Sequence, residues 1–210
     1  MANVLHVQAS PMGDLSYSTR LARTFLEAYR AAHPGDEVET LDLWAADLPE
    51  FDFTAASGKY KIMRGQPHTD AEARAWERVI AEIERLKAAD KLIISSPMWN
   101  FGIPYRLKQW IDVVVQPTYT FSFDPQKGYA GLVTGRPAAL LLARGGEYPP
   151  GSDAAAADHQ RSYLELVLGF IGFTRVEALV VEPTLHGGPE VAEGRLREQE
   201  AAARELASRF

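Results

Sequence analysis

The 210-residue sequence contains no cysteine, which excludes disulfides, thiolate metal sites and cysteine nucleophiles. It also lacks an excess of positive charge, because 22 Lys and Arg face 28 Asp and Glu, for a net charge of −6. A general nucleic-acid binder needs a basic face, so that class is disfavoured. No stretch is apolar for the ~20 residues of a membrane helix, and residues 1–5 show no charged leader. We therefore expect a cytoplasmic protein without a membrane partner.

What is present is the composition of an ordinary globular protein, with 46% hydrophobic and 24% charged residues. We expect a single domain over residues 1–210. Apolar runs that alternate with helical patterns predict an α/β fold with a parallel sheet covered by helices on both faces. The strands are expected at residues 4–7, 38–43, 91–95, 138–142 and 176–181.

Several connections carry local signals of their own. Thr69 and Glu72 have the spacing of a capping box, which predicts a helix that runs to about residue 88. Residues 118–133 predict a hairpin or flap, and Ser152 or Asp153 is expected to begin a helix that ends near Gly169. Residues 44–67 are expected to be irregular and to form a lid or a partner surface.

In open parallel sheets, ligands bind beyond the carboxyl ends of the strands. The loop after the first strand holds Ser10 and the hydroxyls of residues 16–18, and it precedes a helix. Hydroxyls and free N–H groups at a helix start suit a single terminal phosphate, as in FMN. An N-capping loop that only begins a helix explains the same residues equally well.

The loops after the third and fourth strands also have unusual composition. Trp99 and Phe101 bracket Asn100, and a flat heterocycle needs apolar faces for stacking and an amide for its polar edge. Two core aromatics are the alternative interpretation. Gly145 and Gly146 allow a close backbone approach to a ring or a phosphate, although an ordinary turn has the same pattern. The five histidines lack ligand spacing, so no metal site is expected.

At these loops the sequence resembles the FMN-dependent NADH-azoreductases, also called FMN-dependent NADH:quinone oxidoreductases. The resemblance implies a flavodoxin-like five-stranded sheet of order 2-1-3-4-5, non-covalent FMN, and a homodimer with active sites at the subunit interface. It extends over nearly the whole chain and is carried by Val4-Leu5, Ser10, Ser16-Tyr17-Ser18, Ser96-Pro97-Met98-Trp99-Asn100-Phe101, Leu107-Lys108, Asp112, Thr120-Phe121, Gly131-Leu132-Val133-Thr134-Gly135, Arg144-Gly145-Gly146, Leu168-Gly169-Phe170-Ile171-Gly172 and Gly188-Pro189-Glu190.

The resemblance assigns roles position by position. The amide of Asn100 makes it the catalytic candidate, as a donor toward the reduced flavin. Trp99 and Phe123 are the expected substrate contacts, and Phe123 lies in the flap without the hydroxyl that is often seen there. Trp99 replaces a common Tyr, and Ala143 replaces a common Ser or Thr. The implied phosphate ligands are Ser10, Ser16, Tyr17 and Ser18; the implied ring-lining residues are Met98, Trp99, Asn100 and Phe101; the implied contacts at the far edge of the ring are Ala143, Arg144, Gly145 and Gly146.

The implied reaction is a ping-pong transfer of two electrons from NADH or NADPH, through FMN, to quinones or, in two such rounds, to azo compounds that are cleaved to two amines. The rivals are a flavodoxin-type electron carrier, an NADPH-dependent flavin or chromate reductase, and a flavin-free interaction protein. Residues 44–67 and 118–133 favour an enzyme with a covered substrate site. His6 is expected to be a packed strand histidine, His159 to lie on a helix, and Asp158 to belong to a solvated helix face.

Overall fold

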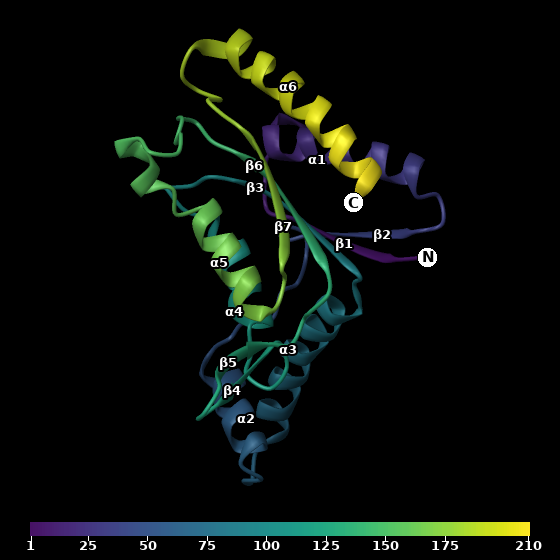
Figure 1. Cartoon of the computed structure of the whole chain (residues 1–210). Coiled ribbons are helices and arrows are strands. Elements are labelled where there is room, and N and C mark those ends of the chain that lie inside the picture. The colour runs from purple at the N-terminus through teal and green to yellow at the C-terminus, as the bar shows by residue number, and fades with distance from the viewer.

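The computed structural model describes all residues, 1–210, and contains one five-stranded parallel sheet. Its order is β2-β1-β3-β6-β7 (Figure 1). The predicted parallel α/β sheet is confirmed. The predicted order 2-1-3-4-5 does not match the observed order when all strands of the chain are numbered. The hairpin strands β4 and β5 lie outside the sheet, so β6 and β7 follow β3 in it. The sheet strands are β1 (Asn3–Gln8), β2 (Glu37–Asp42), β3 (Lys91–Pro97), β6 (Pro137–Ala143) and β7 (Arg175–Val181).

Helices cover both faces of the sheet, which explains why its central strands are apolar throughout. Helices α1 (Tyr17–Ala32) and α6 (Gly188–Arg209) lie together on one face. Helices α3 (Asp70–Ala88), α4 (Tyr105–Val114) and α5 (Arg161–Ile171) cover the other face (Figure 1). None of the helices is both long and apolar enough to cross a bilayer.

Helix α1 shows how the sequence pattern becomes packing. Leu21, Phe25 and Tyr29 recur at helical spacing and are completely buried against the sheet. Burial of each such side chain stabilises the fold by roughly 1.5–3 kcal/mol. The first residue after the helix is His33, and Pro34 follows, so the chain turns toward β2 as expected.

The capping box predicted for the start of α3 is present. Thr69 Oγ1 accepts from the Glu72 N–H, and Glu72 Oε2 accepts from the Thr69 N–H. The same carboxylate accepts from Lys61 Nζ at 2.7 Å and from Ser57 Oγ at 2.6 Å. Led by the bond from Lys61, these donors lower the pKa of Glu72 to about 2. Glu72 therefore joins α3 to the segment before it.

That preceding segment contains a helix, so the expectation of an irregular connection over residues 44–67 is wrong in part. Helix α2 (Phe53–Met63) begins at Asp52, whose Oδ1 accepts from the Ala55 N–H at 2.9 Å. Its apolar residues form no single stripe: α2 buries Ala55, Gly58 and Lys59 and leaves Phe53 exposed. At Gly58 an added Cβ would lie 2.4 Å from the Glu72 carbonyl oxygen, so only glycine allows this close packing.

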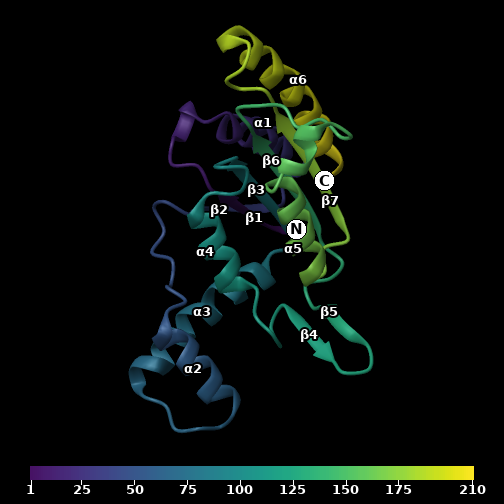
Figure 2. The same cartoon turned by 90° about the vertical axis from the view of Figure 1, so that its left-hand side faces the viewer.

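The predicted hairpin is confirmed as strands β4 (Phe121–Asp124) and β5 (Gly128–Gly131). Asp124 Oδ1 accepts from the next N–H groups, at Gln126 and Lys127, and this shapes the turn. Figures 1 and 2 show the hairpin and α2 at the opposite end of the molecule from the loop that leaves β6. The hairpin packs against the C-terminal end of α5.

The single helix expected from Ser152 or Asp153 to Gly169 is instead two helices. A short 3₁₀ helix, η2 (Asp153–Ala157), is followed by a break at residues 158–160 and then by α5. Because of this break, His159 lies between two helices and not on one. Asp158 is mostly buried in an ion pair with Arg144 and does not belong to a solvated face. Both placements correct the sequence-based expectation.

Candidate functional site

The loop between β1 and α1 presents hydroxyls at the start of a helix. Ser16 caps α1 through a long 3.5 Å contact from the Thr19 N–H to Ser16 Oγ. Ser18 is completely buried, and its Oγ lies 3.0 Å from that of Ser16. Ser10 Oγ accepts from the Met12 N–H at 3.3 Å. The first turn of a helix leaves N–H groups free, so this loop offers hydroxyls and N–H donors to an anion.

The loop after β3 contains a two-residue turn in an uncommon conformation. Trp99 and Gly102 exchange two backbone hydrogen bonds, with N···O distances of 3.0 and 2.9 Å. The two residues between them have positive φ, 48° at Asn100 and 68° at Phe101. Asparagine tolerates this region, whereas phenylalanine is strained there by about 1–3 kcal/mol. Trp99 is 37% exposed and Phe101 56% exposed, so the core interpretation of this pair is wrong.

A third aromatic side chain, which sequence reasoning missed, supports this loop. Trp44 follows β2, and its indole N–H donates to the Ala9 carbonyl at 2.9 Å. Its ring centroid lies 5.7 Å from that of Trp99 and 5.2 Å from that of Tyr105. The available signal was the position of Trp44, directly after the carboxyl end of a strand.

The loop after β6 combines a buried arginine with a close glycine contact. The Arg144 side chain is 2% exposed and turns inward, where Nη2 donates to Asp158 Oδ2 at 2.7 Å. Only the backbone of Arg144 is therefore available at the rim. At Gly145 an added Cβ would lie 2.7 Å from Leu185 Cδ1, so the missing side chain makes room for the loop after β7.

These loops meet around one cavity of about 210 Å³. The sequence indicated that the hydroxyl loop and the aromatic loop would share one rim of the sheet, and they do. Thr184 and Leu185, from the loop after β7, were not foreseen. The predicted residues in the lining are Ser10, Ser16, Tyr17, Met98, Trp99, Ala143 and Gly145.

The other predicted residues lie around this cavity or away from it. Asn100 and Phe101 are exposed in the turn beside Trp99, and Gly146 follows Gly145 in the chain. Phe123 is elsewhere: it lies on β4, in the hairpin at the opposite end of the molecule. Its ring is 4.9 Å from that of Tyr129 and is 61% exposed. Within one chain, Phe123 therefore does not reach the cavity.

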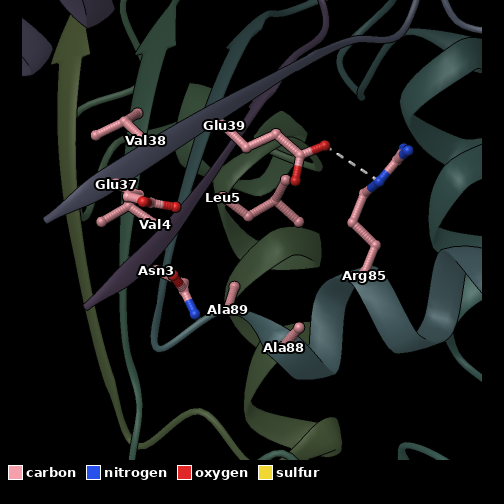
Figure 3. Close-up of a pocket in the computed structure, with 9 residues that line it drawn as sticks. All are labelled: Asn3, Val4, Leu5, Glu37, Val38, Glu39, Arg85, Ala88 and Ala89. Atoms are coloured by element: carbon pink, nitrogen blue, oxygen red, sulfur yellow. Dashed lines mark ion pairs between the residues drawn. The ribbon is translucent and has the colours of Figure 1, made fainter. Parts of the chain in front are cut away.

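A second pocket of about 260 Å³ lies at the amino ends of β1 and β2, against the end of α3 (Figure 3). Glu39 and Arg85 point toward each other in it and form an ion pair with an N···O distance of 3.3 Å. Ligands of parallel sheets bind at the carboxyl ends, and the one cation in this lining is already paired. We therefore assign the functional site to the rim cavity.

His6 is a packed strand histidine, as expected. Its Nε2 lies 2.9 Å from Ser95 Oγ, and its Nδ1 lies 3.3 Å from Thr40 Oγ1. Burial, helped by the positive charge of Arg30, lowers the pKa of His6 from 6.5 to about 4. The imidazole is therefore neutral at pH 7 and supports β1 between its two neighbouring strands.

Comparisons with known proteins agree with this architecture. A family model described as a flavodoxin-like fold matches residues 2–207. The chain is 49% identical to an FMN-dependent NADH:quinone oxidoreductase of Nitratidesulfovibrio vulgaris, over 100% of both chains. It superposes on an azoreductase of Bacillus anthracis with a TM-score of 0.92 and 32% identity, over 100% of both chains. A second azoreductase of that organism, FMN-dependent and solved with FMN, gives a TM-score of 0.89 and 28% identity, over 99% and 100%. The chain belongs to the flavodoxin-like family of FMN-dependent NADH:quinone oxidoreductases and azoreductases.

Proposed function

We propose that this protein is an FMN-dependent oxidoreductase that transfers two electrons from NADH to quinones and reductively cleaves aromatic azo compounds. The observation that carries the proposal is the meeting of the hydroxyl loop, the aromatic loop and the Gly145 loop around one cavity. The names of the full-length relatives support it. We further propose that residues 1–210 act as one FMN-binding domain in the cytoplasm.

The residues at the rim fit FMN. The cavity lining contains no Lys or Arg, so its phosphate-binding capacity comes from hydroxyls and helix N–H groups, which suit a monophosphate. Ser10, Ser16 and Tyr17 would hold the phosphate, with Ser18 fixing the Ser16 hydroxyl from behind. The cavity is smaller than the usual 300–1,000 Å³ of ligand sites, so part of the cofactor would remain accessible at the rim.

The ring system would lie against Met98, Trp99 and the backbone of residues 143–146. When bound, FMN would supply the redox chemistry: a hydride taken from NADH would provide two electrons to the acceptor, and cleavage of an azo compound to two amines would need two such rounds. The chain itself orients the reactants and presents N–H donors toward developing negative charge. Asn100 and the backbone of Gly145 and Gly146 are our candidates for those donors.

No carboxylate or histidine lines the cavity, so we assign the protons of the reaction to solvent. The matching tests use pH. Between pH 6 and 8, the initial rate with a quinone acceptor is expected not to change through the titration of a side chain in the cavity lining. A bell-shaped profile in that range would contradict the assignment.

We propose that the protein acts as a homodimer that completes the site. A two-stranded hairpin is marginal in isolation, yet here it carries exposed Phe123 and Tyr129. On α5, Leu166 is 69% exposed, and Tyr163 and Val167 of the same helix line a groove of about 550 Å³ that residues of α2, α4 and β4 complete. These apolar surfaces require a cover, and a second copy of the hairpin would bring Phe123 to the acceptor side of the rim.

The visible spectrum of the purified protein, followed by anaerobic addition of NADH, tests the function. Bound flavin that NADH bleaches in a single rapid phase, and that a quinone reoxidises, is the expected result. Parallel initial-rate lines over a grid of NADH and quinone concentrations would support ping-pong kinetics. A protein that stays colourless with added FMN would overturn the proposal.

Two alternatives on the same fold are separated when the same experiment is carried out with NADH and with NADPH. A flavodoxin-type carrier would hold flavin that NADH does not reduce directly. An NADPH-dependent flavin or chromate reductase would be reduced faster by NADPH than by NADH. The two aromatic surfaces at the rim and in the hairpin favour an enzyme with a covered substrate site.

A further inference from the structure

Residues 158–160, at the break before α5, each contact a different part of the rim. The His159 N–H donates to the Phe101 carbonyl at 3.0 Å. Gln160 Nε2 donates to the Ser96 carbonyl at 3.1 Å. Asp158 Oδ2 accepts from Arg144 Nη2 at 2.7 Å. Three consecutive residues thus bind the end of β3 at Ser96, the turn in the loop after β3 at Phe101, and the first residue after β6.

Arg144 is the centre of this arrangement. Its Nε donates to Gln160 Oε1 at 3.1 Å, and its Nη1 donates to Glu182 Oε2 at 3.3 Å. The Arg144 carbonyl accepts from both the N–H and the hydroxyl of Thr184, at 2.8 and 2.9 Å. The loop after β7 is therefore fastened to the same arginine. A guanidinium suits this role because its donors have a fixed planar geometry.

Gln160 is completely buried, and both atoms of its amide are used. Its oxygen accepts from Arg144 Nε and its nitrogen donates to the Ser96 carbonyl, so it joins the first residue after β6 to the end of β3. A buried polar bridge with every group satisfied is rigid, whereas one missing partner is costly. The bridge therefore adds a buried side-chain link to the backbone bond that the Met98 N–H donates to the Ala143 carbonyl at 2.8 Å.

The strained turn at Asn100 and Phe101 is held by a contact from the same segment. Phe101 has φ 68° and is exposed, so the packing of its own side chain does not hold the turn. The bond from the His159 N–H fixes its carbonyl from outside. Strained backbone persists only where the surroundings over-determine it.

We propose that Arg144 and residues 158–160 form a brace that sets the position of the aromatic loop relative to the Gly145 loop, and thereby the cradle of the isoalloxazine. Arg144 and Gln160 are positioning residues, since their side chains turn away from the cavity. The inference rests on the proposed function for its cofactor, but the brace exists in the chain without FMN.

Gln160→Met tests the bridge while it leaves the ion pairs of Arg144 intact. The matched control is Arg136→Met, which changes an arginine at the other end of β6. Arg136 Nη1 donates to the carbonyls of Lys87 and Ala89, at 2.6 and 2.7 Å, so the control removes comparable bonds far from the rim.

The measurements are the dissociation constant of FMN, the visible circular dichroism of the bound flavin and its midpoint potential. Gln160→Met is expected to weaken FMN binding about tenfold, to alter the flavin dichroism and to shift the potential. Arg136→Met is expected to lower the melting temperature and to leave all three unchanged. Equal effects of the two variants, or a change below twofold with Gln160→Met, would overturn the brace.

Hydrogen exchange on the apoprotein separates this inference from the proposed function. Gln160→Met is expected to accelerate exchange at the Trp99 and Gly102 amides, which close the turn, while the amides of β3 stay protected. Unchanged exchange at the Trp99 and Gly102 amides would contradict the proposed brace, even if the variant binds FMN. A wild-type protein that binds no FMN would remove the proposed function, and the exchange result would still decide on the brace.

Discussion

Trp44 and Trp99 reach the rim from different loops and lie with ring centroids 5.7 Å apart and planes inclined by 52°. Trp44 is itself fixed by its bond to the Ala9 carbonyl, directly before the hydroxyl loop. The contact therefore links the phosphate side of the rim to its aromatic side. An aromatic pair of this geometry contributes roughly 0.5–1.5 kcal/mol beyond its buried area.

Trp44→Phe keeps an aromatic ring beside Trp99 but removes the indole N–H that donates to the Ala9 carbonyl. The substitution should therefore weaken the link between the two sides of the rim. We expect FMN binding to weaken about two- to tenfold, the range set by one net hydrogen bond. Titration of the apoprotein with FMN, followed by flavin fluorescence, measures the change. Trp76→Phe, in the buried core, is the control and should reduce stability without changing the affinity. A Trp44→Phe protein with wild-type affinity would show that the indole bond does not matter.

Asn100 is expected to act through its amide, and two substitutions separate that role from its backbone. Asn100→Gly keeps the positive φ without strain, while Asn100→Ala removes the amide and adds strain. We expect both variants to slow flavin reduction by NADH about tenfold or more, and only Asn100→Ala to lose stability, by about 1 kcal/mol. Stopped-flow reduction and urea unfolding give the two quantities. Wild-type reduction by Asn100→Gly would remove the amide from the mechanism.

His6 predicts how stability depends on pH. Its pKa is lowered from 6.5 to about 4 in the fold, so the unfolded chain binds more protons between these values. The free energy of unfolding should therefore rise with pH across that window and fall by roughly 3 kcal/mol when the protein is acidified below it. Urea unfolding at pH 4.5 and 7.5 measures most of this change in the free energy of unfolding.

Two variants check that assignment. His6→Gln is expected to be less stable at pH 7.5 and to depend less on pH, since the titrating group is gone. His68→Gln changes an exposed histidine and should follow the wild-type curve. The assignment fails if His6→Gln retains the full pH dependence.

Gly145 and Leu185 predict a coupled pair of substitutions. In Gly145→Ala the added Cβ would lie 2.7 Å from Leu185 Cδ1, so Leu185 must move in the lining of the cavity, while its flexible side chain limits the loss of stability. We expect FMN binding to weaken about threefold to tenfold, and Gly145→Ala with Leu185→Ala to restore it. Additive effects of the two substitutions on the dissociation constant would argue against the contact.

Local patterns predicted much of the fold. Apolar runs such as Leu92-Ile93-Ile94 identified the buried strands, and the spacing of Thr69 and Glu72 identified the start of a helix. These signals lie within a few residues of each other, so the sequence contains them directly. The hydroxyl and aromatic loops were foreseen for the same reason, because strand ends fix where they emerge.

Features held by long-range contacts were missed. Helix α2 lacks an apolar stripe and owes its packing to Gly58 against Glu72, fourteen positions further along the chain. The break at residues 158–160 depends on Arg144 and Ser96, and nothing local distinguishes Asp158 from an exposed helix residue. Only the folded chain shows which distant partners these side chains find.

The hairpin of β4 and β5 contributes no strand to the main sheet, because β3 pairs directly with β6. The exposed part of the hairpin, around Phe123 and Tyr129, can therefore vary in length and in aromatic content while the doubly wound scaffold keeps its register. Changes of substrate range in such a molecule need not begin at the flavin loops. They can begin in this hairpin, which lies outside the sheet that carries those loops.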